Sequence, residues 1–346
     1  WGECFTFADT KEVWHFEIHG PGKGKKGAVW AAQRVPDDEI GVSANAGRIR
    51  GLDLANADYY LASANVESLA EELGWWSKAG GKPFDFTYAY NPDSRNSIYC
   101  RRREWRVLSL LAPSLRLNAE SENFPFSVKP DRKVGVAEVL AIFRDTYGGT
   151  DYDMTRTLTA VNRKGETVKS PVATPFMNGD TLALFRLKRE RTICSPAATY
   201  LQVTQSRDWL PGPIGGVVWI GYDNPATTPH VPVYIGIAQM PASFMVDGRG
   251  AFSRDCAWWA FRTVSRLANF RWQEMSKDIE KVWKGIEDKA FAGQAKFEEE
   301  ALALYKKDPK KARELLTKYT HGLADEAVSA YWKLGEDLWL KYSGNF

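Results

Sequence analysis

The side chain of Asn45 could donate hydrogen bonds to a reacting oxygen. Asn45 follows the apolar run 40–44 in EIGVSANAGRIR, so it lies where a predicted strand gives way to a turn. A neutral, fixed carboxamide is the kind of donor that lines an oxyanion hole, where negative charge develops in a tetrahedral intermediate. Asparagine is also common in turns for structural reasons alone, so the position by itself leaves both interpretations open.

Four arginines cluster at the start of a predicted helix: Arg101, Arg102, Arg103 and Arg106. Helical spacing places Arg102 on the same face as Ile98 and Trp105, the stripe that this helix should bury. A buried, unpaired guanidinium is costly, so Arg102 should meet a carboxylate, a thiolate or a substrate group. For Arg101 we favour the simpler interpretation, a solvated basic face capped by Glu104.

Two carboxylates, Asp151 and Asp153, lie two residues apart in the polar turn GTDYDMT at 149–155. Either could be the acidic partner of a ligand's ammonium group. An exposed helix start capped by an aspartate is at least as simple an interpretation.

His15, Glu17 and His19 alternate along a predicted strand, so they share one face and could in principle bind a metal ion. The residues between them are apolar, and the simpler prediction is that the polar trio marks a solvated face. Cys4 would imitate an N-terminal nucleophile only after loss of three residues. We assign neither a metal site nor a nucleophile here.

The elements that must position these residues follow from hydrophobic periodicity and from turn residues. Strands are expected at 5–8, 13–18, 28–35, 40–44, 182–187, 200–205, 216–222 and 231–237. Helices are expected at 66–76, 98–112 and 136–147, with a polar hairpin or loop at 159–170. From about residue 252 to 341 the chain is helix-favouring, broken near Pro309 and Gly322. Strands first and helices last predict an α+β fold.

Composition excludes several classes of function. The 346 residues are 44% hydrophobic and 26% charged, with 46 basic and 43 acidic side chains and a formal net charge of +3. No basic block suggests nucleic-acid binding, and no apolar run approaches the roughly 18 residues needed to span a bilayer. The cysteines lie far apart without metal-binding spacing, and free thiols are favoured over two disulfides.

Catalytic motifs of other classes are missing from the sequence. The histidines, His15, His19, His230 and His321, do not lie in a GxSxG-like setting that would suggest a serine triad. Neither GxxxxGK[ST] nor GxGxxG occurs, so a nucleotide phosphate site is not indicated.

Five stretches together resemble the C69 dipeptidases, a family of N-terminal-nucleophile (Ntn) amidohydrolases that includes the secernins. They are GECFTFADTKEVW near the start, REWRVLSLLAPS at 103–114, GTDYDMT at 149–155, SRDWLPGPIGGVVWIGYDNPATTPHVPVYIG at 206–236 and SRDCAWWAFRTVSRLA at 253–268. The resemblance runs from Gly2 to about Tyr342. It implies the Ntn four-layer αββα sandwich, here partial, at 1–250, with a helical C-terminal region packed on it at 251–346.

The resemblance also implies a mechanism. In this family a cysteine at the mature N-terminus is both nucleophile and base, so we expect a missing upstream segment of the same protein to carry it, and the 346 residues alone to be inactive. The family pattern assigns Asn45 to the oxyanion hole. It assigns Arg102 or Arg103 to holding the nucleophile or the substrate carboxylate, with the register open. A dipeptide's free ammonium needs an acidic partner, and Asp151 or Asp153 could provide it.

The leading hypothesis is therefore part of a bacterial cysteine dipeptidase with a dipeptide substrate, no metal or organic cofactor, and a homo-oligomeric state. Two alternatives stay open. One is a non-catalytic scaffold that uses its aromatic-rich helical region as an oligomer interface, and the other is a related amide-bond acylase. The cellular compartment also stays open, either the cytoplasm or, with a signal peptide upstream, the periplasm or the exterior.

Overall fold

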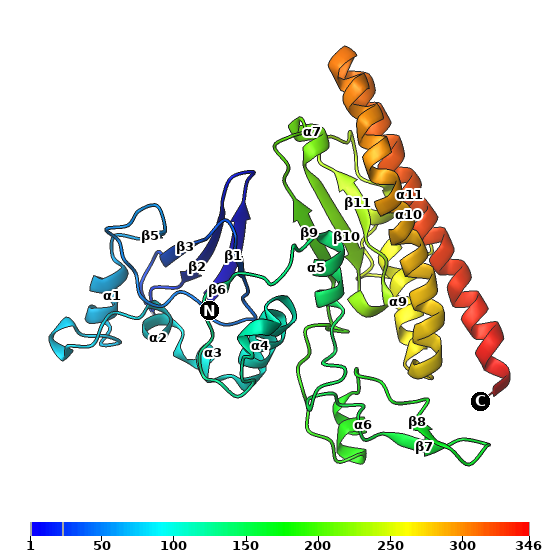
Figure 1. Ribbon diagram of the computed structural model, residues 1–346, viewed down its shortest axis with the longest axis horizontal. Coiled ribbons are helices and arrows are strands. Elements are labelled where there is room, and N and C mark those ends of the chain that lie inside the picture. Colours follow the sequence, from blue (N-terminus) through cyan, green and yellow to red (C-terminus); the bar gives the residue numbers. More distant parts are fainter. Residues whose placement is uncertain (1, 23, 346) are drawn as a thin grey trace. The chain divides into compact units, whose positions relative to one another are not determined.

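The computed structural model describes residues 2–22 and 24–345 and divides into two compact units, Trp1–Gly135 and Val136–Phe346. Both units contain helices and strands, and the described strand pairs are antiparallel. The structure is thus mixed, with several small antiparallel sheets and a helical C-terminal region (Figure 1). The predicted α+β class is confirmed at this level.

A four-stranded sheet forms the framework of the first unit. Its strands are β1 (Gly2–Ala8), β2 (Val13–His19), β3 (Val29–Val35) and β5 (Tyr60–Ala62), in the order β1-β2-β3-β5. The turn between β1 and β2 is closed by Asp9, whose carboxylate accepts from the backbone N–H groups of Lys11 and Glu12 at 2.7 and 2.8 Å. Strand β1 is an edge strand, and all seven of its residues are exposed.

Short helices cover one part of this sheet. They are α1 (Val66–Glu72), α2 (Phe86–Tyr90), α3 (Pro92–Asn96) and α4 (Ile98–Leu111), and a small sheet pairs β4 (Ile40–Gly41) with β6 (Ser127–Val128). Val29, Ile49 and Phe86 are fully buried in the core between β3 and the helices. Because Ile49 belongs to the loop that follows β4, this core also holds the segment next to Asn45.

The second unit is built around a sheet in the order β11-β10-β9. Its strands and helices are α5 (Val136–Phe143), β7 (Thr159–Val161), β8 (Thr167–Lys169), α6 (Gly179–Leu184), β9 (Tyr200–Gln205), α7 (Gly212–Gly215), β10 (Val217–Tyr222), β11 (Val231–Tyr234), α8 (Ala242–Met245), α9 (Ala257–Ala268), α10 (Trp272–Lys307) and α11 (Pro309–Tyr342). Single 3-10 turns occur in the two units at Lys78–Gly80, Pro113–Leu115, Pro225–Thr227 and Ser343–Asn345.

Helices α9, α10 and α11 pack along the β9–β11 sheet and share its hydrophobic core (Figure 1). Trp219 on β10 is fully buried and stacks on Phe291 of α10, with ring centroids 4.2 Å apart. Tyr331 of α11 is also fully buried, and its hydroxyl donates to the carbonyl of Thr227 at 2.6 Å. The long helices are therefore fixed to the sheet by aromatic packing and by a buried hydrogen bond.

The conspicuous stretch 206–236 serves architecture. Arg207 is buried and donates both guanidinium N–H₂ groups to the Glu298 carboxylate of α10, each at 2.8 Å. The same arginine donates to the carbonyls of Ile214 and Gly215, and Tyr234 donates to Glu298 at 2.9 Å. This bidentate pair ties the loop before β10, strand β11 and helix α10 together.

One predicted strand and one predicted helix break are wrong. The run 182–187 is not a strand but mainly the end of α6, whose N-terminus is capped by the Asn178 side chain accepting from the N–H of Thr181. A short apolar run has no clear period, so the cap decided its structure. Gly322 does not break α11, although Pro309 does begin it. An exposed glycine costs a helix only about 1 kcal/mol, and the helix-to-sheet packing outweighs it.

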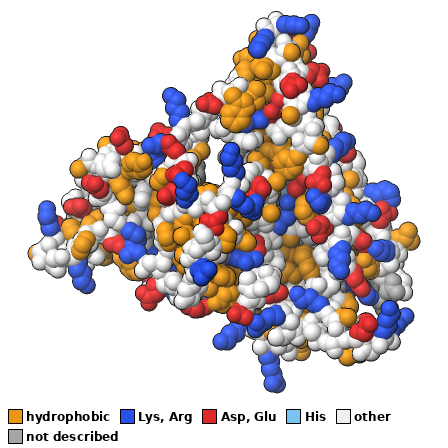
Figure 2. Space-filling view, viewed as in Figure 1, with side chains coloured by type: hydrophobic (Ala, Val, Ile, Leu, Met, Phe, Trp, Pro, Cys, Tyr) orange, Lys and Arg blue, Asp and Glu red, His pale blue; other side chains and the backbone are white. Residues whose placement is uncertain are grey.

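Other expectations are confirmed. Residues 159–170 form the β7–β8 hairpin, and all four cysteines are free. Basic and acidic side chains are interspersed on the face shown in Figure 2, without a block of one sign. Among the described residues, no helix has the length and apolar character that crossing a membrane would require.

Gly215 tests the role of the 206–236 stretch. A Cβ at this position would lie 2.5 Å from the carbonyl oxygen of Arg207 and 3.0 Å from that of Leu210. We expect Gly215→Ala to destabilise the protein by about 1–3 kcal/mol, because backbone atoms cannot move aside cheaply. Chemical denaturation of the variant measures the change. Gly212→Ala is the matched control, since its Cβ would meet nothing within 4 Å, and an equal loss in both variants would contradict this role.

Candidate active site

The loop 43–51 carries Asn45 and is anchored by a buried carboxylate of β2. Glu17 is fully buried, and its Oε1 accepts from the backbone N–H groups of Arg48 and Ile49 at 2.5 and 3.0 Å. His15 Nε2 lies 2.9 Å from the same oxygen. Burial raises the pKa of Glu17, but contacts with His15 and His19 and the Arg48 N–H outweigh burial and lower the pKa to about 2. The ionised carboxylate therefore holds the loop by charge-assisted hydrogen bonds.

A second buried carboxylate, that of Glu104, holds the side chain of Arg48. Glu104 of α4 is fully buried between Arg48 Nη1 at 2.6 Å and Arg95 Nη1 at 3.0 Å. The two guanidiniums also donate to the carbonyls of Pro125 and Glu122. Glu104 was expected to cap a solvated basic face, and that expectation is wrong because the arginines that pair with it come from other segments.

Asn45 itself lies at the exposed tip of this loop in a left-handed conformation, with φ of 59°. Its Oδ1 accepts from Arg103 Nη1 at 2.8 Å. A guanidinium can only donate, so this contact fixes which end of the amide is oxygen and assigns the remaining Nδ2 N–H groups as donors. The arrangement can present a neutral donor to a substrate oxygen.

Arg103 of α4 joins three parts of the site. Besides Asn45, its Nη2 donates to the carbonyl of Ala44 at 2.9 Å and lies 3.7 Å from Cys100 Sγ. The Cys100 thiol in turn lies 3.6 Å from the carbonyl of Asn45. The structure thus brings together Asn45 and Arg103, two of the residues singled out from the sequence.

Arg102 is buried, as the helical stripe predicted. Its Nη2 makes an ion pair with Glu120 Oε1 at 2.8 Å, so the expected carboxylate partner is present. Arg101 is partly buried and donates to the carbonyl of Ser121 at 2.9 Å.

The face with His15, Glu17 and His19 is not solvated, and that prediction is wrong. All three side chains are buried, whereas Trp14, which points to the other face, is only partly so. The loop 43–51 covers the polar face, because the backbone N–H groups of Arg48 and Ile49 in this loop donate to the Glu17 carboxylate on the sheet. Alternation correctly gave the two faces, but only the tertiary fold decided which one is covered.

The two aspartates of the GTDYDMT turn belong to the second unit. Asp153 accepts from the backbone N–H and the hydroxyl of Thr155 at 2.8 and 2.6 Å. Burial raises its pKa, but these bonds and Lys169 outweigh burial and lower it. Asp151 is exposed and pairs with Arg156 at 2.5 Å.

A cavity of about 430 Å³ lies beside the loop in the first unit. Its lining includes Thr6, His15, Ser43, Arg48 and Phe126. It is large enough for a small ligand, and Ser43 and Arg48 come from the loop that carries Asn45.

Comparison with known proteins gives the family of the chain. The model of peptidase family C69 matches residues 2–285. The chain belongs to peptidase family C69.

Three curated relatives of this C69 chain are bacterial. It is 30% identical over 282 residues to a probable dipeptidase of Salmonella dublin, covering 77% of the chain and 56% of that protein. It is 25% identical to a probable dipeptidase of Latilactobacillus sakei, covering 67% and 43%. It is 22% identical to probable dipeptidase B of Streptococcus pyogenes serotype M1, covering 94% and 60%. The C69 chain thus spans about half the length of these relatives.

Sequence reasoning missed the residues that hold the site of this C69 chain. Glu104 and Arg48 are separated by 56 residues, and Glu17 and Arg48 by 31. For Glu104 the available signal was a carboxylate between Cys100 and Leu108 on one face of the predicted helix, but its partners are defined only by the fold.

The lowered pKa of Glu17 predicts an acid-dependent loss of stability. Its folded pKa of about 2 lies below the ordinary value of 4.5, so its contribution is complete well above 4.5 and is lost as the pH falls towards 2. The shift corresponds to about 3 kcal/mol at neutral pH. We expect Glu17→Gln to lose about this amount near pH 7, and the difference from wild type to fall by about half near pH 3, as measured by urea unfolding.

Glu3→Gln provides the control, since Glu3 lies on the exposed edge strand next to β2 and pairs with Ile18 in register. A Glu17→Gln effect that is equal at both pH values would show that the charge of Glu17 does not stabilise the fold.

Proposed function

We propose that the protein is a dipeptidase that transfers the acyl group of a dipeptide to a cysteine thiol and then to water. The observation that carries the proposal is the geometry of Asn45, whose amide oxygen is held by Arg103 while its N–H groups remain as donors. Membership of peptidase family C69 supports it, as do the relatives described as probable dipeptidases.

The chemistry requires a nucleophile, a base and an oxyanion donor. We infer that an N-terminal cysteine supplies the first two, because its α-amine can accept the thiol proton. The sulfur bonds to the peptide carbonyl carbon, and the carbonyl oxygen gains negative charge that Asn45 stabilises. The C–N bond then breaks as the ammonium returns a proton to the leaving amine, and water hydrolyses the thioester.

The cysteines within the 346 residues are poor candidates for this nucleophile. Burial raises the pKa of Cys194 to about 12, and partial burial together with Glu17 raises that of Cys4 to about 11. Cys100 and Cys256 are buried. A thiolate is the reactive form, so the proposal places the nucleophile on a segment of the protein outside these residues.

Arg103 acts in this proposal as a positioning residue for Asn45. It holds both the amide oxygen and the neighbouring carbonyl of Ala44. Arg102 adds positive charge at the start of α4, where it pairs with Glu120. The substrate-binding role of Asp153 and the homo-oligomeric state stay predictions.

The fold proposed for the complete protein is the Ntn αββα sandwich. The exposed edge strand β1 supports it, because it can accept a further strand on its open side. A boundary between the sandwich and the helical region at residue 250 is part of the same proposal.

Asn45→Asp tests the oxyanion donor. The aspartate keeps an oxygen for Arg103 but replaces the N–H donors by a negative charge. We expect kcat for dipeptide hydrolysis by the full-length protein to fall by about 10²–10³-fold, with the unfolding temperature nearly unchanged.

Asn56→Asp is the matched control, because Asn56 is exposed in another turn of the same unit. Arg103→Gln should lower kcat less than Asn45→Asp, since it removes only the group that orients the amide. Unchanged kcat in Asn45→Asp would remove Asn45 from the mechanism.

The nucleophile is tested by intact mass and N-terminal sequencing of the active full-length protein. We expect a mature N-terminal cysteine, and loss of dipeptide hydrolysis after alkylation of its thiol. Hydrolysis by a species without a terminal cysteine would overturn the Ntn mechanism. A mature cysteine terminus without hydrolysis of any dipeptide would instead favour a scaffold or an acylase of another specificity.

A further inference from the structure

We propose that Cys4, His15 and Glu17 form a binding site for a borderline-soft divalent cation of the Zn²⁺ class. These three residues, called here the Cys4 cluster, lie on one face of the β1–β2 hairpin, where His15 and Glu17 are buried and Cys4 is exposed. The proposal does not depend on the dipeptidase activity, because the cation would bind whether or not the chain is catalytic.

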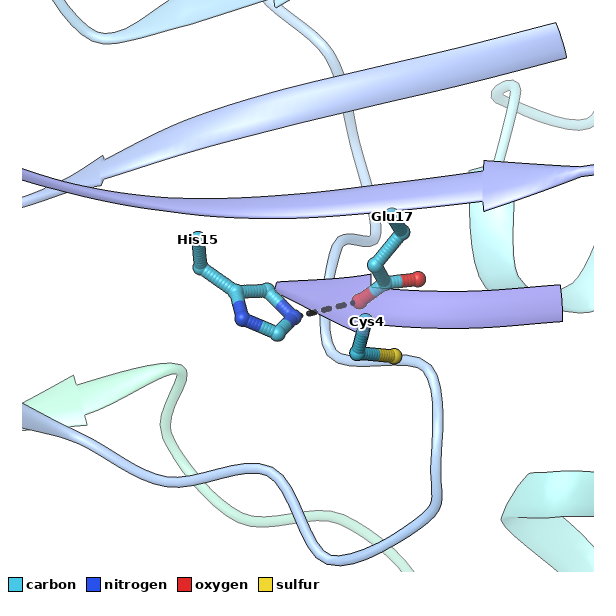
Figure 3. Close-up of side chains that lie close together, drawn as sticks. All are labelled: Cys4, His15 and Glu17. Carbon is cyan, nitrogen blue, oxygen red and sulfur yellow. Dashed lines mark hydrogen bonds and ion pairs between the residues drawn. The ribbon is translucent and has the colours of Figure 1, made fainter. Parts of the chain in front are cut away.

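The hairpin register brings the three side chains together. Cys4 lies directly opposite Glu17 across the antiparallel pair, and Thr6 lies opposite His15, so Cys4, His15 and Glu17 share a face. Their ligand atoms all lie within 4.8 Å of one another, and His15 Nε2 and Glu17 Oε1 are 2.9 Å apart. Figure 3 shows the thiol, the imidazole and the carboxylate converging from two strands.

The donor set selects the class of metal. Zinc takes thiolate sulfur at about 2.3 Å and imidazole nitrogen or carboxylate oxygen at about 2.0–2.2 Å, in a tetrahedron. Its ligand atoms are therefore about 3.3–3.7 Å apart, and the ligand atoms of the cluster lie within 4.8 Å of one another. Magnesium and calcium prefer oxygen ligands alone, and this cluster offers one sulfur and one nitrogen.

Two buried atoms beside the cluster also point to a ligand. Glu17 Oε2 and His19 Nε2 are buried and accept or donate no hydrogen bond within the described residues. They lie 4.0 Å apart, and His19 is only 5% exposed. Buried polar atoms usually have partners. A cation on Oε2 would satisfy Glu17 while Oε1 keeps the N–H groups of Arg48 and Ile49.

Charge and access are compatible with a divalent ion. Glu17 offers a carboxylate, which is one of the usual zinc ligands. A thiolate at Cys4 would bring the ligand charge to minus two, which balances the cation. Metal binding would replace the Cys4 S–H bond by an S–metal bond and release that proton. Neutral His15 would give up its contact with Glu17 Oε1 and carry its ring proton on Nδ1, so that Nε2 offers its lone pair to the ion. The exposed position of Cys4 and the cavity lined by His15 give entry to the ion and to a water in the remaining coordination position.

The site would act on the loop that carries Asn45. A Cβ at Gly47 would lie 3.1 Å from Glu17 Oε2, so the cluster is directly beneath this loop. A bound ion would link β1 to β2 and to Glu17, and should therefore stabilise the first unit by mass action.

Cobalt(II) titration of the metal-free full-length protein tests the proposal, because Co²⁺ reports thiolate and tetrahedral coordination by absorption. We expect a thiolate-to-cobalt charge-transfer band and tetrahedral d–d bands that saturate at one equivalent and are displaced by Zn²⁺. Cys4→Ser should abolish the charge-transfer band, and His15→Gln should weaken Zn²⁺ binding by at least about tenfold. Zn²⁺ should raise the unfolding temperature of wild type but not of Cys4→Ser.

Two matched variants distinguish the site from other thiols and imidazoles. Cys100→Ser removes a buried thiol of the same unit, and His321→Gln removes a partly buried histidine of α11. Both should keep the cobalt spectrum and the zinc affinity. Absence of the charge-transfer band in wild type, or its persistence in Cys4→Ser, would overturn the proposal. So would equal zinc affinity in His15→Gln and His321→Gln.

Discussion

The first unit depends on holding Arg48 by two buried carboxylates. Glu17 accepts from its backbone N–H, and Glu104 pairs with its guanidinium. Removal of one partner would leave an unpaired buried charge, which costs about 3–5 kcal/mol. The loop 43–51 is thereby fixed between β2 and α4, and Asn45 at its tip keeps a left-handed conformation that a mobile loop would not maintain. Preorganisation of this kind is what an oxyanion donor needs, because the donor must not reorganise during the reaction.

The second unit uses the same physical device. Glu298 of α10 forms a bidentate ion pair with Arg207 of the 206–236 stretch. Glu287 of the same helix forms an ion pair with Arg144 at 2.5 Å and lies 2.9 Å from His230 Nδ1. Each ion pair is desolvated and geometrically demanding, so it specifies how helix and sheet meet more than it adds to net stability. The aromatic contacts of α10 and α11 supply the apolar area that offsets this desolvation.

On the covered face of β2, Glu17 has two roles: it anchors the loop 43–51, and it is a ligand of the proposed metal site. Glu17 anchors the loop through Oε1, and its Oε2 lies 4.0 Å from His19 Nε2 and is the oxygen proposed to bind the cation. A cation at Oε2 would therefore be coupled to the position of Asn45 without contacting it. The position of the loop and the proposed metal site thus both depend on the Glu17 carboxylate.

The sequence by itself determined the family, the alternation of the strands, the helical C-terminal region and the burial of Arg102. These depend on residues close together in the chain, whose period, turns and motifs can be read directly. Tertiary structure decided that His15, Glu17 and His19 face the interior, that Glu104 pairs with Arg48 and Arg95, and that residues 179–184 are helical. The physical reason is that a buried charge needs a partner, and here the partners come from segments distant in the sequence. The residues around a charged side chain do not specify which distant residue will pair with it.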